Sequence, residues 1–304
     1  MLGNTFSLKQ LEALVWVADL GSFRKAAQRL GTTQPNISSR IAGLEATLGC
    51  VLMQRDAGSV RFTEKGSEIL LVARKVLREA EALIEVAQRA DLLEDRLRLG
   101  VTELVACTWL HAYLRALKKA YPRLSVELTV DLSRNLDKEL GTHALDLAIQ
   151  TAPFATAARG VIELGKFPYI WVAARNGPAD QPGKYTLDEL IPHTVLTHAR
   201  HTQAYMELTD HADGLGLPTT RFVSSNSLAS CVQMAVDGLG VALLPEALVE
   251  KELAAGGLVR LDVNWTASPL RFAARYQAER VAGHVAKAAA IASEVVANFY
   301  AARP

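Results

Sequence analysis

Cysteine is scarce in this sequence of 304 residues, and long apolar runs are absent. The three cysteines, Cys50, Cys107 and Cys231, stand far apart without a CxxC pair, which argues against a disulfide framework and a zinc ribbon. No run reaches the roughly 18 consecutive apolar residues of a membrane-spanning helix. Residues 1–10 lack the basic and apolar segments of a signal peptide. We therefore expect a cytoplasmic protein with no membrane segment.

An excess of charge of one sign is also missing. The chain holds 33 basic and 32 acidic residues, which on its own argues against nucleic-acid binding. Residues 97–304 are balanced, with 20 residues of each sign, but residues 22–61 carry six basic and two acidic residues. This local charge of +4 indicates a basic surface, which the rest of the first 96 residues cancels.

The common catalytic signatures are absent as well. There is no G-x-S-x-G motif, and the two Gly-x-Gly pairs lack the third glycine of a dinucleotide-binding loop. His198 and His201 could hold a metal ion if Glu207 or Asp210 completed the site, but neither an HExxH motif nor a nearby cysteine supports this. We expect no catalytic residue, no metal and no cofactor.

The first fifty residues have the pattern of three helices. Apolar residues recur at helical spacing from Leu8 to Ala18, Ser22 is a good N-cap for a second helix, and Thr33 can cap a third. The third helix carries one apolar stripe, formed by Ile37, Ile41, Leu44 and Leu48. Short helices joined by a glycine-containing turn are typical of a helix-turn-helix.

Polar residues cover the other side of the third helix. Their hydroxyl, amide and guanidinium groups suit hydrogen bonds to base edges and phosphates. These candidate DNA-binding residues are Gln34, Pro35, Asn36, Ser38, Ser39 and Arg40.

A short hairpin follows the third helix. Two β-like runs flank the turn at residues 56–59, which predicts a wing beside the helix-turn-helix. Arg55 and Arg61 on this wing could contact phosphates or the minor groove, or could simply lie over the hairpin. Thr63 is placed to cap the next helix.

That next helix carries an apolar seam with heptad spacing. The seam residues are Ile69, Ala73, Val76, Ala80, Leu83 and Ala87, with Leu70, Leu77 and Ile84 beside them. The seam can pack on the helix's own domain or pair with a second subunit. The length of the helix favours pairing, which would also supply the two-fold symmetry that paired DNA half-sites require.

The motifs at residues 22–45 and 63–66 together resemble the winged helix-turn-helix of LysR-type transcriptional regulators. In this sequence they read S-F-x-x-A-A, Q-P-x-x-S and T-x-x-G. The resemblance assigns DNA-facing roles to Gln34, Pro35, Asn36, Ser38 and Ser39, with Arg55 on the wing and Thr63 at the next helix. Many family members have arginine directly after the motif serine. Here Ser39 stands in that place and Arg40 follows, so either residue could read a base.

The resemblance also implies partners and an architecture. The partners are double-stranded DNA with a pseudo-palindromic promoter site and a small-molecule effector, for which an organic anion is the family default. Self-association as a dimer or tetramer is implied too, and RNA polymerase stays open as a further partner. The implied α/β architecture is a winged helix-turn-helix, a long coiled-coil linker helix and a two-lobed effector domain like the type 2 periplasmic binding proteins.

Strands and helices alternate after residue 96, which predicts largely parallel, covered sheets. The expected units are a DNA-binding domain at 1–63, a dimerising linker helix at 64–91, a hinge at 92–96 and an effector domain at 97–304. Within the effector domain, lobe I takes residues 97–167 and 269–304, and lobe II takes 168–268.

Polar residues at three strand ends should meet between the lobes, because ligands in such folds bind at the carboxyl ends of strands and at helix N-termini. Glu103 could meet a cationic or amino-bearing effector, or pair with an arginine. The serine-rich segment at 224–227 forms a natural anion cradle, although Ser227 can also be a simple helix cap. The candidate effector-binding residues are Thr102, Glu103, Thr197, His198, Ser225, Asn226 and Ser227.

These features together favour a sequence-specific transcription regulator controlled by a small molecule bound between its lobes. A cytosolic enzyme and a free solute-binding protein are the alternatives. The enzyme lacks a catalytic motif, and the solute-binding protein leaves the first ninety residues unexplained.

Overall fold

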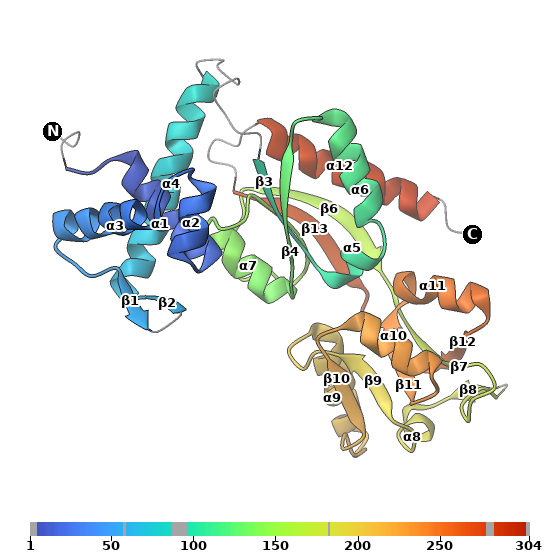
Figure 1. Cartoon of the computed structure of the whole chain (residues 1–304). Helices are drawn as coiled ribbons and strands as arrows, with labels where there is room; N and C mark the ends of the chain where they lie inside the picture. Colours follow the sequence, from blue (N-terminus) through green and yellow to red (C-terminus); the bar gives the residue numbers. More distant parts are fainter. Residues whose placement is uncertain (1–4, 57–58, 87–95, 182, 278–282, 302–304) are drawn as a thin grey trace.

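The computed structural model describes residues 5–56, 59–86, 96–181, 183–277 and 283–301 (Figure 1). The chain forms an amino-terminal helical unit with a small hairpin, followed by two larger sheets that we call lobe I and lobe II. Figure 1 shows lobe I between the helical unit and lobe II. The predicted hinge at 92–96 lies outside the described residues except for Arg96, which already begins a strand.

The helical unit contains the predicted helix-turn-helix. Its helices are α1 (Leu8–Leu20), α2 (Phe23–Arg29) and α3 (Gln34–Leu48). The predicted cap of α2 is present, because the Ser22 hydroxyl accepts a hydrogen bond from the Lys25 backbone N–H. Three of the four stripe residues of α3 are buried, but Leu48 is 38% exposed. Leu48 is the last residue of α3, where the chain turns away through the left-handed Gly49, so the stripe ends one turn earlier than predicted.

The predicted wing is a two-stranded antiparallel hairpin. Strand β1 (Met53–Asp56) pairs with β2 (Ser59–Phe62), and Gln54 lies opposite Arg61. Helix α4 (Glu64–Val86) follows directly. Its Gly66 packs so closely on the chain before the wing that a Cβ would lie 2.0 Å from the Leu52 carbonyl oxygen.

The first half of the predicted α4 seam packs inside the same chain. Ala73 is buried, and Ile69, Leu70, Val76 and Leu77 contact the core of the helical unit. The interpretation of this part as a subunit seam is therefore corrected, because α1 covers it. Leu83, further along the seam, is 72% exposed. Ala87 lies outside the described residues.

Lobe I is a five-stranded sheet with the strand order β4-β3-β5-β13-β6. Strand β3 pairs in parallel with β4 and β5, whereas β13 is antiparallel to both β5 and β6. The strands are β3 (Arg96–Val101), β4 (Ser125–Val130), β5 (Leu147–Thr151), β6 (Gly160–Phe167) and β13 (Leu270–Tyr276). The accompanying helices are α5 (Glu103–Cys107), α6 (Leu110–Ala120), α7 (Ser133–Gly141) and α12 (Gly283–Ala301).

Lobe II is a six-stranded sheet with the order β10-β9-β11-β7-β12-β8. Strands β9, β10 and β11 are parallel, but β7 runs antiparallel to β11 and β12. The strands are β7 (Tyr169–Ala174), β8 (Lys184–Tyr185), β9 (Val195–His198), β10 (Phe222–Ser225), β11 (Val241–Pro245) and β12 (Leu258–Val263). The helices are α8 (Leu187–Leu190), α9 (Gln203–Gly214), α10 (Leu228–Val236) and α11 (Glu246–Ala255).

Both sheets are therefore mixed, and the prediction of largely parallel sheets is wrong for the strands that link the lobes. Strand β6 leads from lobe I into β7 of lobe II, and β13 returns after β12. A strand that enters or leaves a sheet in this way need not follow the parallel β-α-β sequence of its neighbours.

One apolar core joins the two lobes. Leu104 and Trp109 of lobe I belong to the same buried cluster as Leu228 and Cys231 of α10. The helices next to the lobe boundary, α5, α10 and α11, thus pack on one another. Among the described residues, no helix combines the length and apolar character needed to span a membrane.

Candidate DNA-binding and effector sites

The polar side of α3 is open to solvent. Gln34, Pro35, Asn36 and Ser39 are exposed, whereas Ser38 and Arg40 are partly buried on the flanks. On the opposite side Ile37, Ile41 and Leu44 are buried in the helical unit. Helix α3 thus presents hydroxyl and amide groups outward on a rigid support, as a helix that enters a major groove must do.

Two of the predicted DNA-binding residues also make internal hydrogen bonds. The Asn36 side-chain amide donates to the Thr32 hydroxyl at 2.9 Å. The Thr63 hydroxyl donates to the Val51 carbonyl at 2.8 Å and accepts from the Gly66 N–H at 2.8 Å. Thr63 therefore caps α4, as predicted, and ties it to the chain that leaves α3.

The structure describes the side chain of one of the two arginines on the wing. Arg61 is exposed on β2, opposite Gln54 of β1. Arg55 belongs to β1 and pairs through its backbone with Val60, but its side chain lies outside the description. The two arginines sit on neighbouring strands of the same short hairpin.

The sequence did not predict the contacts of three arginines, one of which connects the helical unit with lobe I. The Arg96 guanidinium of β3 lies 4.4 Å from the ring centre of Trp16 in α1, and Arg29 of α2 lies 4.8 Å from the same ring. Arg74 of α4 forms a buried ion pair with Asp19 of α1. The sequence gives little indication of these contacts, because isolated arginines and a tryptophan do not reveal which residues meet in space.

The three predicted effector segments lie at strand ends on the two sides of the lobe boundary. Thr102 follows β3 and is the N-cap residue of α5, in which Glu103 is the first residue. His198 ends β9 and stands in register with Ser225, the last residue of β10. Asn226 is exposed in the connection between β10 and α10.

Glu103 reaches across the boundary to the N-terminus of α10. Its carboxylate accepts hydrogen bonds from the Ser227 hydroxyl at 3.0 Å, the Leu228 N–H at 2.5 Å and the Ala229 N–H at 3.3 Å. Ser227 caps α10 as well, because its hydroxyl accepts from the Ser230 N–H at 3.2 Å. The predicted anion cradle is thus filled by a carboxylate of the chain itself. Within the described part of the chain Glu103 pairs with Ser227 and the α10 backbone and with no arginine, so the alternative of an arginine partner is wrong there.

Three buried polar atoms near this contact have no hydrogen-bond partner among the described residues. They are Thr102 Oγ1, Thr197 Oγ1 and His198 Nε2. Buried polar atoms normally have a partner, so an unpaired group indicates a place for a ligand or a water molecule. Burial lowers the pKa of His198 to about 4, although the Glu103 carboxylate acts in the opposite direction.

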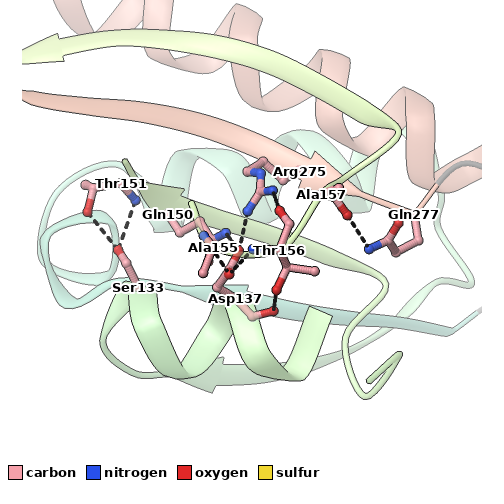
Figure 2. Close-up of polar contacts among 9 residues, drawn as sticks. All are labelled: Ser133, Asp137, Gln150, Thr151, Ala155, Thr156, Ala157, Arg275 and Gln277. Carbon is pink, nitrogen blue, oxygen red and sulfur yellow. Dashed lines mark hydrogen bonds and ion pairs between the residues drawn. The ribbon is translucent and has the colours of Figure 1, made fainter. Parts of the chain in front are cut away.

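A buried polar network that the sequence did not predict lies between α7 and strands β5 and β13 of lobe I (Figure 2). Asp137 of α7 accepts hydrogen bonds from the Gln150 side chain at 3.1 Å and from the Thr156 N–H at 2.7 Å, and it pairs with Arg275 of β13. Burial raises the pKa of Asp137, but hydrogen bonds from Thr156, Arg275 and Gln150 outweigh it and hold the pKa below its usual value. The network fixes the segment after β5 to α7.

The same view shows a smaller contact at the end of β5 (Figure 2). The Ser133 hydroxyl lies 2.7 Å from the Thr151 hydroxyl and accepts a hydrogen bond from the Thr151 N–H at 2.9 Å. Strand β5 pairs with β3, so Thr151 lies on the same edge of the sheet as Thr102. This edge adds hydroxyl groups that the sequence reasoning did not include.

A cavity of about 310 Å³ lies elsewhere, lined by residues of the neighbouring strands β7 and β12 of lobe II and by Thr266. None of the predicted effector residues lines it. Its lining residues are Tyr169, Ile170, Trp171, Arg260, Leu261, Asp262, Val263 and Thr266. Within the described ranges, no three histidine, cysteine or acidic residues gather as metal ligands.

Two family models match the sequence. Residues 8–67 match the model for the bacterial regulatory helix-turn-helix protein of the lysR family, and residues 90–292 match the LysR substrate binding domain. A probable hydrogen peroxide-inducible genes activator of Streptomyces viridosporus is 31% identical over 83% of this chain and 81% of the relative. The transcriptional regulator PtxR of Pseudomonas aeruginosa is 28% identical over 86% of this chain and 84% of the relative.

Solved structures share the fold. Full-length OxyR from Pseudomonas aeruginosa, solved as a variant, is 23% identical, with a TM-score of 0.77 over 96% of this chain and 94% of that chain. ArgP from Mycobacterium tuberculosis is 24% identical, with a TM-score of 0.66 over 94% of this chain and 96% of that chain. The family models and the curated relatives agree with the helix-turn-helix and the two-lobed domain. The chain therefore belongs to the LysR family of transcriptional regulators.

Proposed function

We propose that this regulator binds a pseudo-palindromic promoter site as a dimer, with α3 of each subunit in the major groove. The exposed polar side of α3 carries the proposal, because it stands opposite a buried apolar stripe that holds the helix rigidly. In this arrangement Gln34, Ser39 and Arg40 are the candidates for base contacts.

The wing and the flanks of α3 supply the phosphate contacts in this proposal. Arg61 is exposed on β2, and a guanidinium there can pair with a phosphate oxygen. Pro35, Asn36 and Ser38 lie in the first turns of α3, where they can contact phosphates beside the groove. We assign Thr63 a supporting role, since its hydroxyl is occupied by Val51 and Gly66. Arg55 stays a candidate from the sequence.

The proposed effector site is the boundary between the two lobes. Thr102, Thr197 and His198 provide the unpaired polar atoms there, and Ser225 stands in register with His198. A small molecule that bound these groups would contact both lobes. Such a ligand shifts the protein toward the lobe arrangement that it binds best. We propose that this shift reaches the DNA through the contacts of Arg96 with Trp16.

We propose a reversibly bound effector rather than oxidation of a cysteine, although some relatives are named for hydrogen peroxide. Peroxide reacts with a thiolate, which requires a low pKa. Burial raises the pKa of Cys231 to about 11, and burial also raises the pKa of Cys107 above its ordinary value. The chemistry of these two thiols therefore disfavours a peroxide sensor in the effector lobes.

The proposed assembly is a dimer through the second half of α4, with a tetramer as the higher form. Leu83 is 72% exposed on this part of the helix, where the heptad seam continues beyond the helical unit. We propose the units expected from the sequence, a DNA-binding domain at 1–63, a linker helix at 64–91 and an effector domain at 97–304, with the hinge ending before Arg96, which already begins β3.

DNase I footprinting of the region upstream of the chain's own gene tests the DNA proposal. We expect a protected segment with two related half-sites, and the absence of any protected segment would overturn the proposal. A thermal-shift screen of small carboxylates and amino acids tests the effector proposal, because a ligand of the folded state raises the midpoint of unfolding. A true effector should also change the footprint.

A further inference from the structure

Glu103 behaves as a ligand built into the chain. It belongs to α5 of lobe I, but its carboxylate accepts hydrogen bonds from one hydroxyl and two backbone N–H groups at the N-terminus of α10 in lobe II. Helix N-termini bind anions because their first N–H groups are unpaired and the helix dipole is positive there. Glu103 therefore takes the position that the carboxylate of an effector would take.

Two further polar groups near this contact have no hydrogen-bond partner among the described residues. Thr197 is fully buried and its hydroxyl has no partner among the described residues; the same holds for His198 Nε2. His198 is close enough to Glu103 for their charges to interact. Hydroxyl groups and an imidazole can donate hydrogen bonds to an anion, so the region offers donors beyond those that Glu103 occupies.

The contact also joins the two lobes directly. The residues that it connects lie 124 to 126 positions apart in the sequence, at the start of α5 in lobe I and of α10 in lobe II. A hydrogen bond to a charged group is stronger than one between neutral groups. Replacement of the Glu103 carboxylate by a free anion would satisfy α10 but would remove this link.

We propose that Glu103 is an intramolecular competitor for the anion position at α10, and that the effector is a small carboxylate or similar anion that displaces it and releases the direct link between the lobes. This inference rests on the proposed effector role of the boundary for its regulatory consequence. The occupancy of the anion position by Glu103 can be tested separately.

The test measures carboxylate binding after removal of the internal carboxylate. Glu103→Ala is titrated with sodium acetate, at constant ionic strength maintained with sodium chloride, and the midpoint of thermal unfolding is recorded. We expect a saturable rise of the midpoint in Glu103→Ala and little rise in the wild type, because acetate then fills the vacant position. Glu163→Ala removes an exposed carboxylate of lobe I and is the matched control.

Two further variants test the Ser227 hydroxyl as a donor and guard against misfolding of Glu103→Ala. Adding Ser227→Ala to Glu103→Ala removes the hydroxyl donor and should weaken the acetate response severalfold. Glu103→Gln keeps the shape of the side chain, so it remains measurable if Glu103→Ala does not fold. It should lower the midpoint of unfolding relative to the wild type, since the charge is lost. An acetate response of Glu103→Ala equal to that of Glu163→Ala, or a Glu103→Gln midpoint equal to the wild type, would overturn the proposal.

The regulatory consequence has its own readout. Without any effector, Glu103→Ala should give the altered footprint that an effector causes in the wild type. If acetate binds Glu103→Ala but no variant binds DNA, the proposed function fails while the intramolecular competitor stands. If DNA binding is intact and the acetate response is absent, only the competitor is overturned.

Discussion

At the scale of single residues, Gly66 allows α4 to lie against the backbone before the wing. A Cβ at this position would lie 2.0 Å from the backbone oxygen of Leu52, which cannot move as a flexible side chain could. We expect Gly66→Ala to destabilise the helical unit by about 1–3 kcal/mol. This loss outweighs the roughly 1 kcal/mol by which alanine favours a helix over glycine.

Urea unfolding measures this effect, and Gly43→Ala in α3 is the matched control. The nearest atom to a Cβ at Gly43 is the end of the flexible Gln10 side chain, at 3.1 Å. Gly43→Ala should therefore leave the unfolding midpoint unchanged or raise it. Equal midpoints for the two variants would contradict the role given to Gly66.

His198 makes stability depend on pH. Its pKa in the folded protein is about 4, below the ordinary value of 6.5, so the unfolded chain binds more protons between these values. The free energy of unfolding should therefore fall as the pH falls from 6.5 toward 4, by roughly 1 kcal/mol per pH unit. His198→Asn should flatten this part of the pH profile, measured by urea unfolding. An unchanged slope in the variant would show that other groups cause it.

At the scale of elements, the helices of the helical unit could be predicted because their caps and apolar stripes are local in sequence. Two features could not be predicted, since both depend on where the other helices lie. They are the exposed end of α3 at Leu48 and the half of the α4 seam that α1 covers. Strand β3 can be predicted from its alternating apolar residues Leu97, Leu99 and Val101, which are buried. Strand β6 could not be predicted, because four of its eight residues are exposed and its apolar residues do not alternate regularly.

Part of the candidate effector site could be predicted, because some of its residues stand at the ends of strands. Strand ends locate Thr102, Thr197 and Ser225, because the order of elements along the chain indicates which edges meet. The partner of Glu103 could not be predicted, since Leu228 lies 125 residues away and on the other lobe. Likewise, nothing local to α7 indicates that Asp137 meets Arg275.

The pair of Asp137 and Arg275 should be essential for lobe I. Asp137→Ala would leave the buried Arg275 without its carboxylate, which costs about 3–5 kcal/mol. Glu246→Ala is the control, because its partner Arg260 is 61% exposed and such pairs contribute about 0–1 kcal/mol. Chemical unfolding should separate the two variants clearly, and similar losses would contradict the structural role of the network.

Because the pKa of Asp137 is lowered in the folded protein, its contribution to the stability of lobe I is lost in acid. The carboxylate stabilises the fold fully above its ordinary pKa of 3.8, and the stabilisation is lost as the pH falls through the lower pKa of the folded state. His198 acts at higher pH, between 6.5 and about 4. The two groups should therefore leave separate steps in a pH series of unfolding midpoints.

At the scale of the whole molecule, self-association should depend on the far half of α4. Leu83→Glu places a charge on the exposed part of the predicted seam and should raise the dimer dissociation constant at least tenfold. Analytical ultracentrifugation measures this change. Leu239→Glu is the control, since Leu239 is 59% exposed in lobe II, away from α4. Unchanged association of the Leu83 variant would remove the seam from the interface.

The near-zero net charge of the whole chain argues against DNA binding only if the charges are evenly spread, and they are not. The +4 of residues 22–61 coincides with α2, α3 and the wing, whereas α4 carries several of the acidic residues that balance it. DNA affinity should thus come from a compact set of phosphate contacts, doubled by dimerisation, rather than from a broadly basic surface.

The most direct test of this account is fluorescence anisotropy with DNA from the region upstream of the chain's own gene and a scrambled duplex of equal composition. The wild type should bind the first at least a hundredfold more tightly than the second at the same salt concentration. Arg40→Ala should reduce this preference, whereas the exposed Arg159→Ala in lobe I should not. Equal affinity of the wild type for both duplexes would contradict the claim that α3 reads a promoter sequence.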